Sequence, residues 1–133
     1  MINRLSSSTK FKIVNLIDPC PDDSAIKLAN DKNLIIFKKI DEAVAHQKID
    51  AIILCTPNLF HMDQTIKASN LGIHVFCEKP LSLKSSEVKK MIYACNKNKL
   101  ILGVGHERRF EKGWQRLKAV SYTHLTLPTI YSV

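Results

Sequence analysis

The feature that most constrains the fold is a short apolar run, residues 74–77 (HVFC), that stops abruptly at Glu78, Lys79 and Pro80. An apolar run of this length is typical of a strand buried on both faces of a parallel sheet. Pro80 has no backbone N–H to give to a sheet, so the strand has to end before it. Glu78 and Lys79 are therefore expected at the carboxyl end of a strand, which is where ligands bind in open α/β sheets.

Three more apolar runs have the same form. Residues 11–17, 51–55 and 100–105 run into Asp-Pro, Thr-Pro-Asn and His-Glu-Arg-Arg, respectively. If the strands are parallel, all four polar sets fall on one edge of one sheet. The simpler alternative is that strands end in turns and turns are polar. Because the pattern recurs four times, we favour a single crevice.

The segments between the runs carry helix signals. Asp22, Asp23 and Ser24 are N-cap candidates for a helix to about residue 30, and Asp41 is one for a helix to residue 46. Residues 59–71 are long enough for a helix that stops at Gly72. Residues 85–96 place an apolar stripe against the sheet, formed by Val88, Met91, Ile92 and Cys95. With a weaker strand at residues 34–37, the alternation predicts a doubly wound parallel α/β sheet.

Composition sets wider bounds. A chain of 133 residues suits one domain with a core, and its longest apolar runs are too short to span a membrane. The four cysteines have no metal-type spacing, so we expect no metal site and no disulfide framework. Three of them, Cys55, Cys77 and Cys95, fall in elements expected to be buried, where a thiol behaves as a small apolar group. A reducing cytoplasmic location fits this use of cysteine.

The net charge of +8 raises the question of nucleic acid as a partner. The lysines, however, are scattered through predicted helices and turns, and aromatic residues do not alternate with them as a base-stacking surface requires. A solvated surface is the better interpretation, and we expect no nucleic-acid partner. Arg108 and Arg109 are the exception, because they follow a strand end where a phosphate or carboxylate can bind.

Three motifs in order resemble one family. They are T-P-N-x-x-H at residues 56–61, G-x-H-V-x-x-E-K-P at residues 72–80 and G-H-x-R-R-F at residues 105–110. Together they resemble the glucose–fructose oxidoreductase and inositol dehydrogenase family (Gfo/Idh/MocA), over about residues 11–119. The resemblance implies an N-terminal Rossmann domain of an NAD(P)-dependent oxidoreductase. It also implies a small-molecule substrate of the sugar or polyol type, hydride transfer with the nicotinamide, and a parent protein that can form homo-oligomers.

The resemblance implies cofactor contacts for residues in the first half of the chain. Asp18 matches the acidic residue that binds the adenosine ribose hydroxyls, and its charge favours NAD, with NADP as the alternative. The other reading of Asp18 is a turn aspartate before a proline. Thr56, Pro57 and Asn58 match the loop along the dinucleotide. His61 matches a histidine of the following helix, where the alternative is a helix-start residue hydrogen-bonded to backbone.

Glu78 and Lys79 resemble the pair near the nicotinamide ribose and the substrate. Lys79 is the expected catalytic residue, because its ammonium can hydrogen-bond the reacting hydroxyl and assist proton movement. The alternative is a structural ion pair between Lys79 and Glu78. His106 and Arg108 resemble the loop below the nicotinamide, and Glu107 departs from the amide commonly found there.

The glycine-rich phosphate loop of the Rossmann fold has no match. Its G-x-G-x-x-G fingerprint follows the first strand, whereas the four glycines here are Gly72, Gly103, Gly105 and Gly113. We therefore expect an incomplete sheet that lacks its first strand and glycine-rich loop. The strands starting at Phe11 and Ala51 would then pair directly or leave an open slot.

The expected organisation is a partial NAD(P)-binding Rossmann domain at residues 1–120, followed by a tail at residues 121–133. The tail is rich in threonine, carries no Asp, Glu, Lys or Arg, and resembles a translated adapter sequence, so we interpret it as non-native or unstructured. We expect such a fragment to be inactive alone. A non-catalytic dinucleotide-binding or regulatory Rossmann protein is the second hypothesis.

Overall fold

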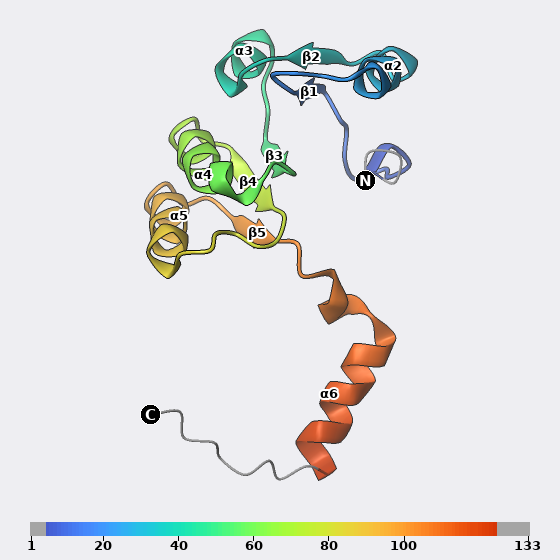
Figure 1. Ribbon diagram of the computed structural model, residues 1–133, viewed down its shortest axis with the longest axis vertical. Coiled ribbons are helices and arrows are strands. Elements are labelled where there is room, and N and C mark those ends of the chain that lie inside the picture. Colours follow the sequence, from blue (N-terminus) through green and yellow to red (C-terminus); the bar gives the residue numbers. More distant parts are fainter. Residues whose placement is uncertain (1–4, 125–133) are drawn as a thin grey trace.

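The computed structural model describes residues 5–124, and five short strands alternate with helices along them (Figure 1). The strands are β1 (Asn15–Ile17), β2 (Ile35–Phe37), β3 (Ala51–Leu54), β4 (His74–Cys77) and β5 (Leu102–Val104). Each pairing between them is parallel, which confirms the predicted α/β class. The first strand is shorter than the apolar run that predicted it. The start of the run lies outside the sheet, and Phe11 there is 64% exposed.

The strands form two sheets, so the prediction of one continuous sheet edge is wrong. One sheet has the order β1-β2 and the other has the order β3-β4-β5. Of the two arrangements left open by the sequence, direct pairing of β1 with β3 does not occur. The doubly wound order 3-2-1-4-5-6 explains this, because it puts another strand between those that β1 and β3 represent. Figure 1 shows the two groups of strands one above the other.

The helices begin and end close to the predicted positions. They are α2 (Asp23–Asp31), α3 (Ile40–His46), α4 (His61–Asn70), α5 (Ser85–Lys97) and α6 (Lys112–His124), with short 3₁₀ turns η1 (Asn58–Phe60) and η2 (Glu107–Phe110). The predicted N-cap is confirmed, because the Asp22 carboxylate accepts the Ala25 N–H at 2.7 Å. Gly72 follows α4 with φ of +76°, the left-handed conformation that ends a helix.

Asp41 does not cap α3, contrary to the prediction. The helix begins one residue earlier, at Ile40, and its N-cap Lys39 makes no side-chain hydrogen bond. Asp41 therefore lies inside the first turn, and its carboxylate pairs with Lys67 of α4.

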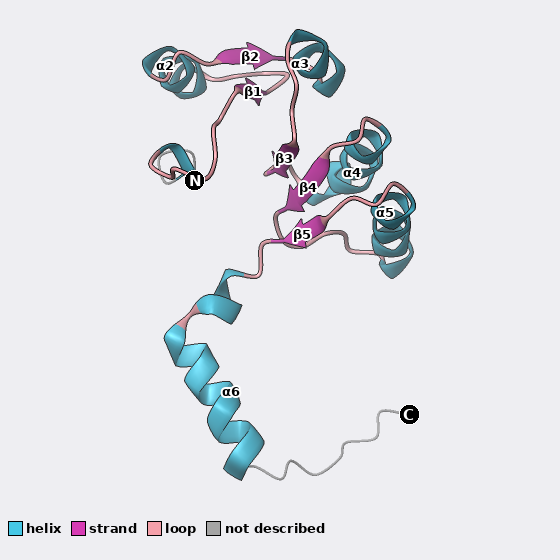
Figure 2. Cartoon of the chain, turned by 180° about the vertical axis from the view of Figure 1, so that it is seen from behind, coloured by secondary structure: helices cyan, strands magenta, loops and turns pink. Residues whose placement is uncertain are grey.

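The core lies in the three-stranded half. Its buried residues come from β3, β4, α4, α5 and the turn before β4: Leu54, Ala68, Ile73, Val75, Cys77 and Met91. Helices α4 and α5 lie side by side against one face of this sheet (Figure 2). The α5 stripe is confirmed at Met91 and Cys95, which are fully buried, whereas Val88 is half-buried and Ile92 is 45% exposed.

The opposite face of the three-stranded sheet is open, so the prediction of strands buried on both faces is only half right. Ile53 and Phe76 are partners across β3 and β4, and both are about two-fifths exposed. Cys55, expected to be buried, is exposed because it lies one residue past the end of β3.

The remaining predictions concern absent features and the tail. No helix within residues 5–124 is long and apolar enough to cross a membrane, and those residues place no three metal-ligating side chains together. Helix α6 extends past residue 120 to His124, and residues 125–133 of the predicted tail lie outside the described residues.

Candidate functional site

Three segments leave the three-stranded sheet at its carboxyl edge. They are residues 56–58 after β3, residues 78–80 after β4 and residues 105–107 after β5, here called the rim. Backbone hydrogen bonds hold them in register: the Glu78 N–H donates to the Leu54 carbonyl at 2.9 Å, and the Gly105 N–H donates to the Cys77 carbonyl at 3.0 Å. Parallel pairing thus brings together most of the site residues that the resemblance implies.

His61 joins two of the rim segments, the one after β3 and the one after β4. It is the first residue of α4 and is 1% exposed. Its Nε2 lies 2.7 Å from the Thr56 carbonyl oxygen, and its Nδ1 lies 3.0 Å from the Pro80 carbonyl oxygen. A neutral imidazole donates from one nitrogen only, whereas an imidazolium donates from both. With both nitrogens facing backbone carbonyls, the ring holds the rim together, and its direct contact with a cofactor stays a prediction.

The loop after β3 is fixed by α4. The Thr56 hydroxyl donates to the Gln64 side-chain oxygen at 2.6 Å, so this side chain faces the helix. Pro57 is exposed, and Asn58 is half-buried at the start of η1. Pro57 is therefore the most exposed member of this loop.

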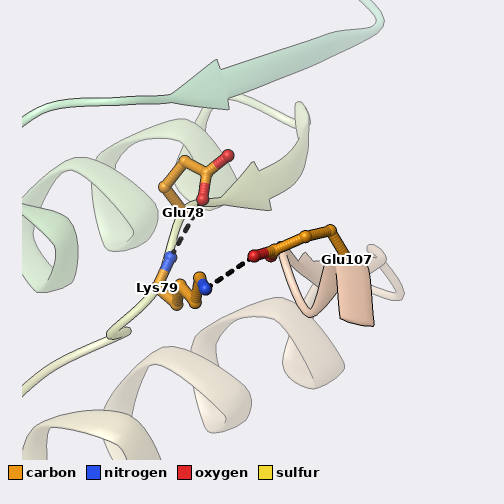
Figure 3. A network of polar contacts seen from close by, with 3 residues as sticks. All are labelled: Glu78, Lys79 and Glu107. Carbon is orange, nitrogen blue, oxygen red and sulfur yellow. Dashed lines mark hydrogen bonds and ion pairs between the residues drawn. The ribbon is translucent and has the colours of Figure 1, made fainter. Parts of the chain in front are cut away.

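Lys79 reaches across the rim to Glu107 (Figure 3). Its Nζ lies 2.7 Å from Oε1 of Glu107, and the two side chains are 46% and 57% exposed. Glu78 accepts the backbone N–H of Lys79 at 3.3 Å. The alternative of a Lys79–Glu78 ion pair is therefore replaced by a pair with Glu107. The hydrogen bond from Lys79 is the main cause that lowers the pKa of the Glu107 carboxyl.

Gly105 is a site residue that sequence reasoning missed. A Cβ at this position would lie 2.7 Å from Oε2 of Glu78, closer than real side chains allow. Glycine therefore lets the end of β5 pack against the Glu78 carboxylate. The signal was available in the third motif, because its first residue is this glycine, directly after the apolar run.

His106 and Arg108 lie in the segment after β5. His106 is exposed, and its backbone N–H donates to the Val104 carbonyl at 2.8 Å. The Arg108 guanidinium lies 5.5 Å from the ring centroid of Trp114 in α6, which is a cation–π geometry. The structure thus puts His106 at the rim and turns the Arg108 side chain toward α6.

Asp18 lies in the other sheet, at the end of β1. Its backbone N–H donates to the Phe37 carbonyl at 2.9 Å, and its Oδ1 accepts the Cys20 N–H at 2.9 Å. The second contact is the local turn that the sequence offered as the alternative for this residue. The structure therefore does not join Asp18 to the rim by a described contact.

The polar side chains of these segments suit the two ends of a dinucleotide. Asp18 supplies a half-buried carboxylate, an acceptor for ribose hydroxyls, and Lys79 supplies an ammonium donor at the rim. A pyrophosphate instead needs backbone N–H groups at a helix N-terminus. The N-terminus of α2 is already capped by the Asp22 carboxylate, and among the described residues no glycine lies between β1 and α2. The residues thus fit the ribose and nicotinamide ends better than the phosphates.

Comparisons with known proteins show the family and the fold. The sequence model described as "Oxidoreductase family, NAD-binding Rossmann fold" (Gfo/Idh/MocA) matches residues 1–106. An uncharacterized oxidoreductase of Streptococcus pneumoniae is 34% identical over 107 residues, which is 80% of this chain and 28% of that protein. Myo-inositol 2-dehydrogenase of Thermotoga maritima is 35% identical over 82 residues, which is 62% of this chain and 25% of that protein.

Solved structures give the same result. The WlbA dehydrogenase from Bordetella pertussis, solved in complex with NADH and UDP-GlcNAcA, superposes with a TM-score of 0.77 at 25% identity. The alignment covers 84% of this chain and 34% of that one. The chain thus spans about a quarter to a third of the proteins that it matches, and it belongs to the Gfo/Idh/MocA family of oxidoreductases through their NAD-binding Rossmann fold.

Proposed function

We propose that this chain is the nucleotide-binding part of an oxidoreductase that transfers hydride between a nicotinamide cofactor and a carbinol substrate. The observation that carries the proposal is the rim, where parallel pairing and His61 hold the segments after β3 and β4 together and Lys79 reaches the segment after β5. Ligands of open α/β sheets bind outside this edge.

Each rim residue has a proposed role. When bound, the nicotinamide supplies the hydride chemistry. Lys79 is the proposed catalytic residue: its ammonium donates a hydrogen bond to the substrate oxygen and moves a proton there. Glu78 fixes the backbone of Lys79, and His61 fixes the loop after β3 and the loop after β4. The loop residues Thr56, Pro57 and Asn58 are proposed to lie along the dinucleotide, with His106 and Arg108 below the nicotinamide.

The substrate class is proposed from the relatives. One is named for myo-inositol, and another was solved with a nucleotide sugar, so the shared chemistry is a ring bearing several hydroxyl groups. A small sugar, polyol or related carbinol is the proposed substrate here. NAD is the preferred cofactor because the Asp18 carboxylate at the ribose would repel the 2′-phosphate of NADP.

We further propose that residues 1–120 form only part of the cofactor domain and act within a larger protein. The support is the absence of a glycine-rich loop from the sequence and the unpaired edges that β1 and β3 have among the described strands. A cytoplasmic location and a homo-oligomeric parent belong to the same proposal, with residues 121–133 outside the native domain. Each missing hydrogen bond to a charged phosphate costs about 1.5–3 kcal/mol, so losing three or four weakens binding by several orders of magnitude.

Two titrations of the chain test the proposal. Calorimetry with NAD is expected to show no tight binding, and a submicromolar dissociation constant would refute the partial-domain proposal. Saturation-transfer NMR at millimolar NADH is expected to show contact at both ends of the cofactor. Asp18→Ala should weaken transfer to the adenosine ribose, and Lys79→Ala should weaken transfer to the nicotinamide. No transfer to NADH at that concentration contradicts the nucleotide-binding function.

One observation favours a second candidate, a regulatory protein that binds dinucleotide without hydride transfer. The Lys79 ammonium is already engaged by Glu107, as it would be if its role were structural. The two candidates differ in what Lys79→Met does. In the oxidoreductase it changes NADH contacts at the nicotinamide and leaves the fold unchanged. In the regulatory protein it leaves those contacts unchanged, as it does the fold.

A further inference from the structure

Lys79 and Glu107 are 28 positions apart in sequence, and each follows a different strand of the three-stranded sheet. Figure 3 shows the Glu107 side chain approaching the Lys79 ammonium from η2, with the Glu78 carboxylate beside the Lys79 backbone instead. Glu78 thus accepts the backbone N–H of Lys79, and Glu107 accepts a hydrogen bond from its ammonium.

The exposure of this ion pair limits what it can do. Both side chains are about half exposed, so solvent screens their attraction and ordering two long side chains costs entropy. Such a pair adds little to fold stability. The pair nevertheless sets the direction of the Lys79 ammonium. One of the three N–H groups of the ammonium donates to Glu107, and the other two point elsewhere and can donate to a ligand.

Resting on the proposed function, we propose that Glu107 is a positioning residue for Lys79. Its carboxylate holds the Lys79 ammonium between the β4 and β5 segments of the rim. The remaining N–H groups of the ammonium are then oriented to donate to a substrate oxygen. An amide accepts the same hydrogen bond without the charge, so glutamate binds the ammonium more strongly.

Side-chain NMR of the chain tests this role. In the wild type, the charged groups acting on Glu107 are Lys79 and Arg108, and both lower its pKa. Lys79→Gln is expected to raise the titration midpoint of the Glu107 carboxyl toward the ordinary glutamate range, because it removes the largest cause. In Glu107→Gln, the ammonium protons of Lys79 should exchange faster with water, while the free energy of unfolding stays at its wild-type value.

Two internal controls accompany the test. Glu111→Gln changes an exposed carboxylate just past η2 and should alter neither signal. The ammonium of Lys84, which pairs with Glu87, should keep its exchange rate in Glu107→Gln. If Glu107 titrates alike in the wild type and Lys79→Gln, the positioning role is wrong.

The test separates this inference from the proposed function. If the titration shifts as expected but millimolar NADH makes no contact, Glu107 still holds Lys79 in solution, and the nucleotide-binding function fails. If NADH contacts the rim but the Glu107 titration ignores Lys79, the function stands and the positioning role is overturned.

Discussion

The two sheets of this chain differ in how well they are packed. The three-stranded sheet carries α4 and α5 on one face, and the main buried cluster is formed by this sheet, the two helices and the turn before β4. In the two-stranded half, the buried apolar residues are Ala29, Ile40 and Ala43, and residues of the strands themselves remain partly exposed. Both halves obey the same βα pattern in sequence, so the difference comes from tertiary packing.

The difference separates the two parts of the candidate site. The rim residues rest on the packed half, where His61 and parallel pairing fix their positions. Asp18 rests on the less packed half, where its neighbours are a local turn and one strand. We therefore expect the nicotinamide end of the site to be better preorganised than the ribose end.

A matched isoleucine pair tests the packing difference most strongly. Ile73 is 2% exposed beside β4, whereas Ile35 in β2 is 48% exposed. Ile73→Ala should lower the free energy of unfolding by about 2–5 kcal/mol, because it leaves a cavity in the core. Ile35→Ala should cost well under half as much in the same urea denaturation. Equal losses would mean that the two halves are packed alike.

Cysteine reactivity offers a second comparison. Burial raises the pKa of the Cys77 thiol from 9.0 to about 11, with Cys55 and Glu78 adding to it. The thiolate is the reactive form, so near neutral pH this shift alone lowers its population about 100-fold. Variants that keep only Cys77 or only the exposed Cys20 should differ at least that much in labelling rate with a disulfide reagent. The Cys77 rate should rise with pH until about 11, and similar rates for both would contradict its burial.

His61→Ala tests whether this ring supports the rim. The substitution removes the hydrogen bond that the ring donates to the Thr56 or Pro80 carbonyl, at an expected cost of about 1–3 kcal/mol in unfolding free energy. His106→Ala, at an exposed position of the same rim, is the matched control and should change stability little. Amide exchange of residues 56, 58, 79 and 81 should quicken in His61→Ala only, and unchanged exchange there would mean that the ring does not hold the loops.

The smallest expected effect concerns the cap of α2 in the two-stranded half. Hydrogen bonds from Ala25 and Ser24 lower the pKa of Asp22, so its capping is present above the unfolded pKa and is lost as pH falls through the lower folded value. Protection of the Ala25 amide should therefore decrease at acid pH in the wild type. Asp22→Asn should keep protection without this acid dependence, because asparagine caps equally well, and Asp22→Ala should lose protection at all pH values. An acid transition that persists in Asp22→Asn would show that another group causes it.

Local signals in the sequence predicted most elements. The stop at Pro80, the cap at Asp22 and the left-handed Gly72 each depend on a few neighbouring residues, and each lies where it was expected. The split into two sheets could not be read in this way, because it depends on which strand edges become neighbours. The exposure of Phe76 has the same origin, since an apolar residue in a strand does not reveal whether anything covers its face.

The sequence predicted which segments form the site, but it did not predict which groups their side chains contact. Spacing alone put Glu78 and Lys79 at a strand end, where they are. The partner of the Lys79 ammonium depends on the path of η2, which brings Glu107 back over the rim from 28 positions away. The role of His61 likewise required the positions of two loops, because its contacts are backbone carbonyls that have no sequence signature.

The central claim is that the rim is a nicotinamide-dinucleotide site, and amide NMR of the labelled chain with millimolar NADH tests it most directly. The account predicts amide shifts concentrated at residues 56, 58, 78, 79 and 105–107, with smaller ones near Asp18, and weaker shifts at the other rim residues in Lys79→Ala. Shifts confined to the groove between α4 and α5, lined by Lys89, Tyr93 and Lys97, would contradict it, as would no shift at all.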